Sequence, residues 1–223
     1  YVTPTSGGNA TDWGANSSYS HRGGTGGNND TRGLLILGES SSQYIEYLTI
    51  ATTGSISDFG TASVAANYGG GVNSNTRCIF NLSTSTEVNT LEYVTTATTG
   101  SASDYGDLTN TVQATAGVDS STRGVFAGGV YNSTYTNVIQ YITMASTGNA
   151  TDFGDTNVSA KEVYGLGKGN TTRGVFMQNT GSPNDGNTTF VTIASAGNAS
   201  TFGDLSVARN TSGTGSNAHG GVQ

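Results

Sequence analysis

The sequence predicts an all-β protein built from five similar units, and three observations lead to this prediction. A phrase of the form Gly-x-x-x-(Asp/Thr)-aromatic-Gly occurs five times in the 223 residues. Its leading glycines are 46, 46, 48 and 49 residues apart, a spacing typical of stacked or ringed units. The apolar runs are short and rich in β-branched and aromatic residues, and none has helical periodicity. Units of this size cannot bury a core alone, so we expect an array. The phrases begin at Gly8, Gly54, Gly100, Gly148 and Gly197.

The third repeat is the clearest example of one unit. Strands are expected over Arg123–Ala127 and Val138–Ala145, because β-branched and aromatic residues dominate both runs and Gly, Asn and Ser clusters bound them. A weaker third strand is expected over Leu108–Thr115. The segment Asp104–Gly106 supplies a short fourth strand or a tight corner. Four short strands in about 46–49 residues match the blade of a β-propeller.

Large aromatic residues occupy the same two positions in every unit. A β-propeller needs bulky side chains between neighbouring sheets, and each buried ring contributes about 2–3 kcal/mol. The first aromatic column lies seven residues before each leading glycine and the second lies within the phrase. They consist of Tyr1, Tyr47, Tyr93, Tyr141 and Phe190, and of Trp13, Phe59, Tyr105, Phe153 and Phe202.

The two ends of the chain predict how the array closes. The segment Tyr1–Thr5 corresponds to the strand that the last repeat lacks. The segment Ala218–Gln223 corresponds to a degenerate form of the strand that follows Thr-Arg in the other repeats. Pairing these two segments would satisfy both edges at once. We therefore expect one domain, 1–223, forming a five-bladed propeller with repeats at about 1–46, 47–92, 93–140, 141–189 and 190–223. The competing interpretation is a segment cut from a longer protein with further blades or a stalk.

Composition limits the partners. The net charge of −7 argues against nucleic acid and against anionic membrane surfaces, which both require clustered Lys and Arg. No apolar run approaches the roughly 20 residues that a membrane helix needs. The one cysteine, Cys78, stands where other repeats have glycine, which predicts a small buried thiol.

Catalytic motifs are missing from the sequence. The two histidines, His21 and His219, are not in metal-ligand spacing, and the glycine-rich stretch 23–27 lacks the Lys-Ser/Thr of a phosphate loop. A pair of aspartates acting as a glycosidase and an oxygen-ligand Ca²⁺ site near Asn28–Asp30 are the alternatives left open. We expect no enzyme activity, no cofactor and no metal.

The order of elements resembles the kelch repeat. An apolar strand ending in Gly-Gly, Val125–Gly129, precedes the strand Asn137–Tyr141, and Phe153 and Val163–Gly165 match the later part. The usual kelch tryptophan is replaced by Phe or Tyr except at Trp13. The phrases Thr122–Gly129 and Tyr141–Asp155 are more similar still to Thr/Ser/Asn/Gly-rich, kelch-like repeats of virion and tail-associated proteins of tailed phages, especially marine ones. The resemblance covers essentially the whole chain and implies a propeller on a virus particle.

Two charged columns accompany the repeat. A repeated Arg in a chain with 10 % charged residues predicts a structural role, either pairing with the Asp column or bonding loop carbonyls between blades. A ring of Arg facing an acidic glycan is the functional alternative. The columns are Arg32, Arg77, Arg123 and Arg173, and Asp12, Asp58, Asp104 and Asp152.

Tyrosines in the variable loops are the candidate ligand-binding residues, because loops on a repeated scaffold carry function. They are Tyr19, Tyr44, Tyr131 and Tyr135, and covering a neighbouring apolar surface is their alternative role. With the resemblance, this predicts a non-enzymatic virion propeller, in a tail, fibre or capsid appendage, exposed on the particle surface and attaching to a host-surface glycan or receptor. Other virion proteins are further expected partners, and a homo-oligomer is compatible with the sequence. A purely structural decoration or joint protein and a secreted five-bladed lectin are the alternatives.

Overall fold

The all-β prediction is confirmed by a computed structural model. It describes residues 1, 8–14, 17, 19, 24–36, 43–65, 68–84, 86–160, 167–177 and 186–207, and these contain strands and no helix. The strands of the first two sheets are β1 (Thr25–Asn28), β2 (Arg32–Ile36), β3 (Tyr44–Thr49), β4 (Ser57–Thr61), β5 (Tyr68–Asn73), β6 (Arg77–Ser83), β7 (Val88–Thr95) and β8 (Ser103–Val112). Those of the next two are β9 (Ala116–Asp119), β10 (Arg123–Ala127), β11 (Val130–Tyr131), β12 (Thr134–Thr143), β13 (Thr151–Ala160), β14 (Gly167–Gly169), β15 (Arg173–Met177), β16 (Asn187–Thr192) and β17 (Ser200–Asp204).

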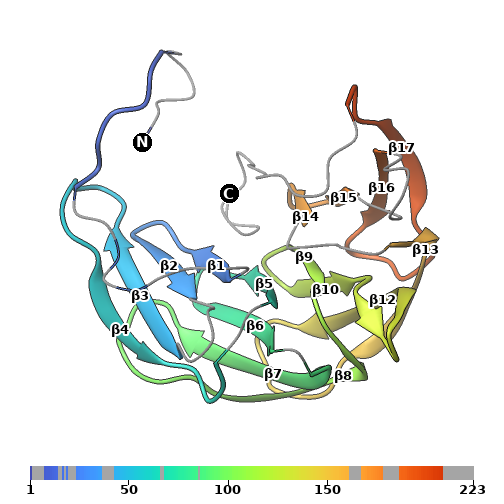
Figure 1. Cartoon of the computed structure of the whole chain (residues 1–223), viewed down its shortest axis with the longest axis horizontal. Coiled ribbons are helices and arrows are strands. Elements are labelled where there is room, and N and C mark those ends of the chain that lie inside the picture. The colour runs from blue at the N-terminus through green and yellow to red at the C-terminus, as the bar shows by residue number, and fades with distance from the viewer. Residues whose placement is uncertain are drawn as a thin grey trace.

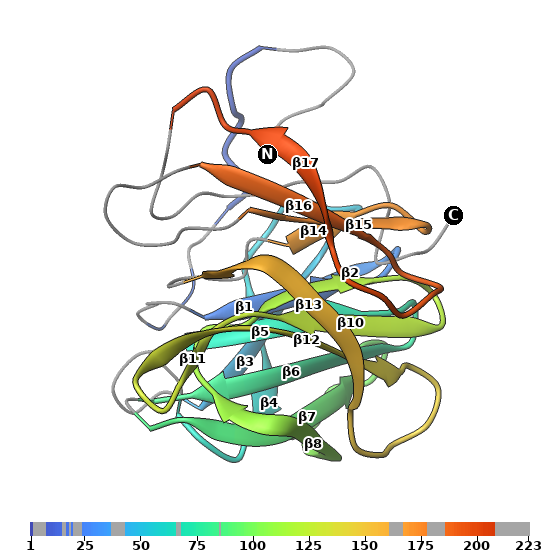
Figure 2. The same cartoon turned by 90° about the vertical axis from the view of Figure 1, so that its right-hand side faces the viewer.

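The strands form four antiparallel sheets that share one plan. Their orders are β1-β2-β3-β4, β5-β6-β7-β8, β9-β10-β12-β13 and β14-β15-β16-β17, and β11 adds to β12 in the third. The sheets stand side by side around a common centre in an open arc, with the first strand of each nearest the centre (Figure 1). The view in Figure 2 shows the neighbouring sheets stacked face to face. The innermost strands β1, β5, β9 and β14 contact one another in that order.

Each sheet combines parts of two sequence repeats. The second sheet takes β5 and β6 from the repeat 47–92 and β8 from the next, and the boundary near residue 93 falls within β7. The polypeptide chain of one repeat therefore passes from each sheet to the next. The sheet is the unit of hydrogen bonding, whereas the sequence repeat is the unit that links one sheet to the next.

The strand predictions within the third repeat are partly right. The strand β10 has the predicted bounds. The strand β12 begins at Thr134, earlier than predicted, because Val130–Tyr131 folds back on it as a hairpin, and it ends at Thr143, before the predicted Ala145. The separate strand expected over Leu108–Thr115 is wrong. Most of that stretch continues β8, where Leu108 and Val112 are buried. This long strand stays paired with β7 through two register shifts. The true inner strand is β9, whose Ala-Gly-Val-Asp sequence gives little strand signal.

The core lies between the sheets. One cluster joins the first and second sheets and contains Phe59 and Phe80. A second joins the second and third sheets and contains Tyr105 and Phe126, and a third joins the third and fourth sheets and contains Phe153. Buried Cys78 belongs to the first cluster, as predicted. Each sheet is therefore stabilised by burying its faces against its neighbours.

Glycines allow the innermost strands to approach closely. A side chain at Gly70 would place its Cβ 2.6 Å from the Thr115 carbonyl oxygen, and one at Gly71 would place its Cβ 2.7 Å from the Thr25 hydroxyl. Such distances leave no room for a methyl group, so the inner strands must be glycine-rich where the arc is tightest. The expected pairing of Tyr1–Thr5 with Ala218–Gln223 lies, apart from Tyr1, outside the described residues.

Candidate binding surface

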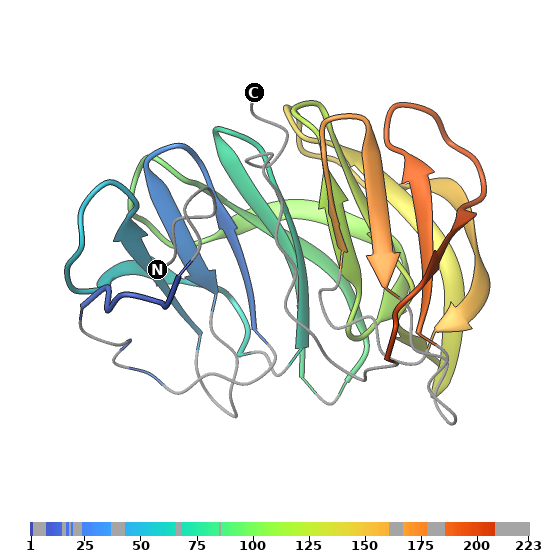
Figure 3. The same ribbon diagram turned by 90° about the horizontal axis from the view of Figure 1, so that it is seen from above.

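The two ends of the sheets differ in how their connections are built. We call the end that carries the turns between β1 and β2, β5 and β6, β9 and β10, and β14 and β15 the turn end, and the opposite end the loop end. Short hairpins gather along the turn end (Figure 3). In the first hairpin the Asn29 Oδ1 accepts hydrogen bonds from the Thr31 and Arg32 backbone N–H groups, at 2.9 and 2.8 Å. Ser74, Ser120 and Asn170 make the same contacts in the other three.

The Thr-Arg turns position the Arg column at this end. Each guanidinium lies over the ring of the first aromatic column in its own sheet, 4.2–4.8 Å from the ring centroid. Three guanidinium groups also donate to a backbone carbonyl of the following sheet. The contacts are Arg32 to Thr96, Arg77 to Met144 and Arg123 to Ile193, at 3.3, 3.4 and 3.0 Å.

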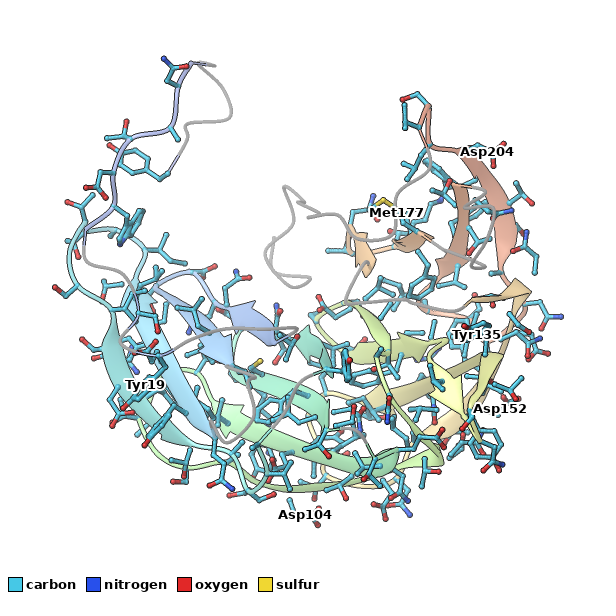
Figure 4. All side chains as sticks on the ribbon, in the orientation of Figure 1. Tyr19, Asp104, Tyr135, Asp152, Met177 and Asp204 are labelled. Carbon is cyan, nitrogen blue, oxygen red and sulfur yellow. The ribbon has the colours of Figure 1, made fainter. Side chains whose placement is uncertain are left out.

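The Asp column lies along the outer edge strands of the sheets. Asp58, Asp104 and Asp152 are exposed on the outer strands β4, β8 and β13, and Asp104 and Asp152 lie on the outer rim in Figure 4. Asp12 is also exposed, and its Oδ1 accepts the Gly14 N–H at 3.1 Å. The Arg contacts between sheets use carbonyl groups, so the two charged columns are separate features of the fold.

Two of the four candidate tyrosines come together at the loop end of the first sheet. The rings of Tyr19 and Tyr44 are stacked, with centroids 3.8 Å apart and planes 9° from parallel. Tyr44 opens β3 and is 38 % exposed. Partial burial, together with Tyr44 and the negative charges of Asp58 and Glu46, raises the pKa of Tyr19 above its ordinary value. The pair therefore presents an aromatic surface near the exposed carboxylate of Asp58 and the buried carboxylate of Glu46.

The other two candidate tyrosines share the β11–β12 hairpin but not a face of it. Val130 pairs with Tyr135 and Tyr131 pairs with Thr134, so the two tyrosine side chains point to opposite faces. Tyr131 is 37 % exposed. The tip is held from the neighbouring sheet by Glu87, whose carboxylate accepts the Asn132 and Ser133 N–H groups at 2.8 and 3.0 Å. Figure 4 shows Tyr19, which lies beside the first sheet, and Tyr135, in the third sheet, far apart along the arc.

A buried polar column was not recognised in the sequence. Glu46, Glu92, Gln140 and Thr189 occupy equivalent positions on the third strand of each sheet, and all are buried. Glu92 accepts the Ser63 N–H at 3.2 Å, and Gln140 accepts both the N–H and the hydroxyl of Thr109, at 2.6 and 2.8 Å. Glu46 accepts the Ser17 hydroxyl. Ser17, Ser63 and Thr109 are 46 residues apart in succession, and this spacing was the signal that could have identified the contact.

Potential metal ligands do not cluster in the described residues. The part of the chain that the structure describes contains no group of three or more His, Cys, Asp or Glu side chains able to hold a metal ion. His21 and His219 lie outside that part, whereas Asn28–Asp30 lies within it. Among the same residues, no helix is long and apolar enough to cross a membrane.

Comparison with models of known protein families finds no match for this chain. Comparison with curated proteins likewise finds no similar protein.

Proposed function

We propose that this chain is a five-bladed, kelch-like β-propeller on the surface of a phage particle, where it attaches to a host-surface glycan without catalysing a reaction. The resemblance of the repeat phrases to those of virion proteins of tailed phages supports the location. The common plan of the four sheets around one centre supports the propeller. The observation that carries the binding function is the stacked, partly exposed Tyr19–Tyr44 pair at the loop end.

The chemistry around this pair favours a neutral sugar. Tyrosine rings stack on the apolar faces of sugar rings, and carboxylates accept hydrogen bonds from sugar hydroxyls. Asp58 and Glu46 contribute negative charge at the pair, and the whole chain carries a net charge of −7. Both charges repel uronic acids and sulfated glycans. The Arg groups that could attract an acidic glycan are engaged with aromatic rings and carbonyl groups at the turn end.

Binding to host-derived polysaccharides tests the proposal. The full chain should bind neutral polysaccharides on a glycan array more strongly than acidic ones, and Tyr44→Ala should weaken the binding at least tenfold. Tyr44→Phe keeps the ring and should retain most of the affinity. The control is Ile50→Ala, because Ile50 is 39 % exposed but lies at the turn end, after β3. Absence of binding across the array, or an equal loss of affinity in the Ile50→Ala control, would favour a structural decoration or joint protein.

The closed ring has its own test. In the described sheets the Arg column pairs with a threonine across the second and third strands, as in Arg123 with Thr143. The corresponding residues at the chain ends are His219 and Thr3, which lie outside the described residues. In a ring closed by the terminal strands, Thr3→Cys combined with His219→Cys should form an intramolecular disulfide under oxidation. Absence of this cross-link in a folded chain would argue against pairing of the two ends.

A further inference from the structure

Neighbouring sheets are joined along their outer rim by one repeated contact, which we call the rim joint. At each joint the carbonyl of the second aromatic column accepts the N–H of the leading glycine of the next phrase. Three joints link neighbouring sheets: Phe59 to Gly100, Tyr105 to Gly148 and Phe153 to Gly197, at 2.7–2.8 Å. A fourth, Trp13 to Gly54 at 3.0 Å, links the N-terminal segment to the first sheet. Two residues later a second backbone bond follows, as from the Ala150 N–H to the Asp107 carbonyl at 2.7 Å.

The rim joint explains why the phrase ends with glycine. A Cβ at Gly106 would lie 2.5 Å from the Gly148 carbonyl oxygen, and a Cβ at Gly154 would lie 2.6 Å from that of Gly197. The backbones approach too closely for any side chain at the closing glycine. At the last phrase, in contrast, nothing lies within 4 Å of a Cβ at Gly203.

The last sheet therefore presents one unoccupied half of a rim joint. Phe202 is 56 % exposed, whereas its equivalents Phe59, Tyr105 and Phe153 are 2–3 % exposed because the following sheet covers them. The geometry of β17 is otherwise that of the other outer strands. Its Phe202 ring meets Phe190 edge-to-face at 6.1 Å, as Phe153 meets Tyr141 at 6.0 Å. The half-joint is thus formed, and none of the described sheets covers it.

The N-terminal segment presents the other half. Tyr1 and Thr11 exchange backbone hydrogen bonds, and Tyr1 meets Trp13 edge-to-face at 5.6 Å, so this segment is built like the outer edge of a fifth sheet. One side of it is already joined to the first sheet through Trp13 and Gly54. Its other side begins with Gly8 and continues to Ala10, which is exposed.

Residue types at the two free halves match those at the occupied joints. At two joints an Asp backbone N–H donates to the Asn that follows the leading glycine: Asp107 to Asn149, and Asp155 to Asn198, at 3.1 and 3.0 Å. The free halves carry Asp204 and Asn9 at these positions. The alanine that follows is half-buried against the core at Ala150 and Ala199, and its counterpart Ala10 is exposed.

We infer that the edge Phe202–Asp204 is a docking surface for the chain's own N-terminal phrase, Gly8–Asp12. In the docked state the Phe202 carbonyl accepts the Gly8 N–H, the Asp204 N–H donates to Asn9 Oδ1, and Ala10 covers the Phe202 ring. The occupant is the same chain because the phrase is already joined to the first sheet, and the two free halves face each other across the opening of the arc (Figure 1). This seam rests on the five-unit ring proposed above, and it is independent of glycan binding.

Cysteine cross-linking of the full chain tests the seam. Thr61 and Ser101 occupy the Asp and Asn positions of the second joint, and their hydroxyl oxygens are 3.0 Å apart. Thr61→Cys with Ser101→Cys is therefore the positive control, expected to form a disulfide on mild oxidation. Asn9→Cys with Asp204→Cys places thiols at the same two positions of the seam. We expect a disulfide within one chain, seen as loss of both free thiols at monomer mass. The variants Asn9→Cys and Asp204→Cys, each made alone, control for reaction with Cys78.

Two results would overturn the inference. One is a seam variant whose disulfides only join separate chains, which would make a second copy the occupant. The other is a seam variant that stays reduced while the control pair closes. Should the seam variant fail to fold, hydrogen exchange of the unmodified chain decides. The Gly8 and Ala10 amides should then be as protected as those of Gly100 and Ala102, and free exchange would refute the seam. Failure of the Thr3–His219 cross-link alone, or of glycan binding alone, leaves these readouts unchanged.

Discussion

The occupied rim joints and the free edge at β17 carry nearly the same sequence in different surroundings. Phe153 is buried by the fourth sheet, whereas Phe202, at the equivalent position, is 56 % exposed. Both rings meet the preceding aromatic column edge-to-face in the same way. The repeated phrase therefore fixes the geometry within a sheet, and burial depends on whether a following unit is present. The free energy of each joint belongs to the pair of units rather than to either phrase.

The largest expected difference comes from truncating the aromatic ring at the two places. Phe153→Ala should lower the free energy of unfolding by about 3–5 kcal/mol, because it removes a buried ring between two sheets. Phe202→Ala should cost nearly as much if the seam is closed, and less than about 1 kcal/mol if the edge remains exposed. Denaturant unfolding measures both. Val207→Ala is the control, since Val207 is equally exposed and lies outside the joint.

Substituting the closing glycine should give the next largest effect. Gly106 has a φ of 140°, and a Cβ there would collide with the Gly148 carbonyl, so Gly106→Ala should cost about 2–4 kcal/mol from backbone strain and crowding. Gly54→Ala is the matched control at a leading glycine, where nothing lies within 4 Å of the added Cβ. Equal unfolding midpoints for the two variants would show that the close approach at the rim does not limit stability.

Removing an Arg contact should have a smaller effect. Arg123→Gln loses the stacking on Tyr141 and the charged donor to the Ile193 carbonyl, which together should cost about 1–3 kcal/mol. Arg173→Gln should cost less, because the contact described for Arg173 is with the Phe190 ring alone. Thermal unfolding compares the two. Glycan binding should be unaffected in both, and loss of adhesion by a stably folded Arg123→Gln would return the Arg column to the binding surface.

The sequence predicted what is local and repeated. The strand Arg123–Ala127 and the aromatic columns follow from alternating β-branched and aromatic residues, which identify strands wherever they occur. The inner strand Ala116–Asp119 was missed because close packing at the centre demands small residues, which remove the apolar signal that marks a strand. Which residue accepts the hydrogen bond of the Arg123 guanidinium could not be predicted, because every residue has a backbone carbonyl whatever its side chain.

The candidate site was less predictable than the fold. Four loop tyrosines were equivalent by composition, yet Tyr19 stacks on Tyr44 while Tyr131 and Tyr135 take opposite faces of a hairpin. That difference depends on the position of Tyr19 against the first residue of β3 and on the β11–β12 hairpin, and neither feature recurs in the other described sheets. Features without a period offer no second copy of the sequence with which to check an interpretation.

The smallest effect concerns pH, at the one rim joint whose buried aromatic carries a hydroxyl. The Tyr105 hydroxyl donates to the Thr143 carbonyl and lies 2.6 Å from that of Ser146, across the joint. Burial raises the pKa of Tyr105 above 10, against the opposing charge of Arg77. Because the raised pKa means that the folded state favours the neutral phenol, the phenol's contribution to the free energy of unfolding is complete below pH 10 and is lost as pH rises through the folded-state pKa.

Tyr105→Phe should cost about 1 kcal/mol at pH 8 through the lost hydrogen bonds, and less at pH 11. Thermal unfolding of both chains at these two pH values measures the difference, and Phe153 in the next joint shows that phenylalanine fits the position. A cost that stayed constant with pH would mean that the Tyr105 phenol ionises as readily in the folded chain as in the unfolded one.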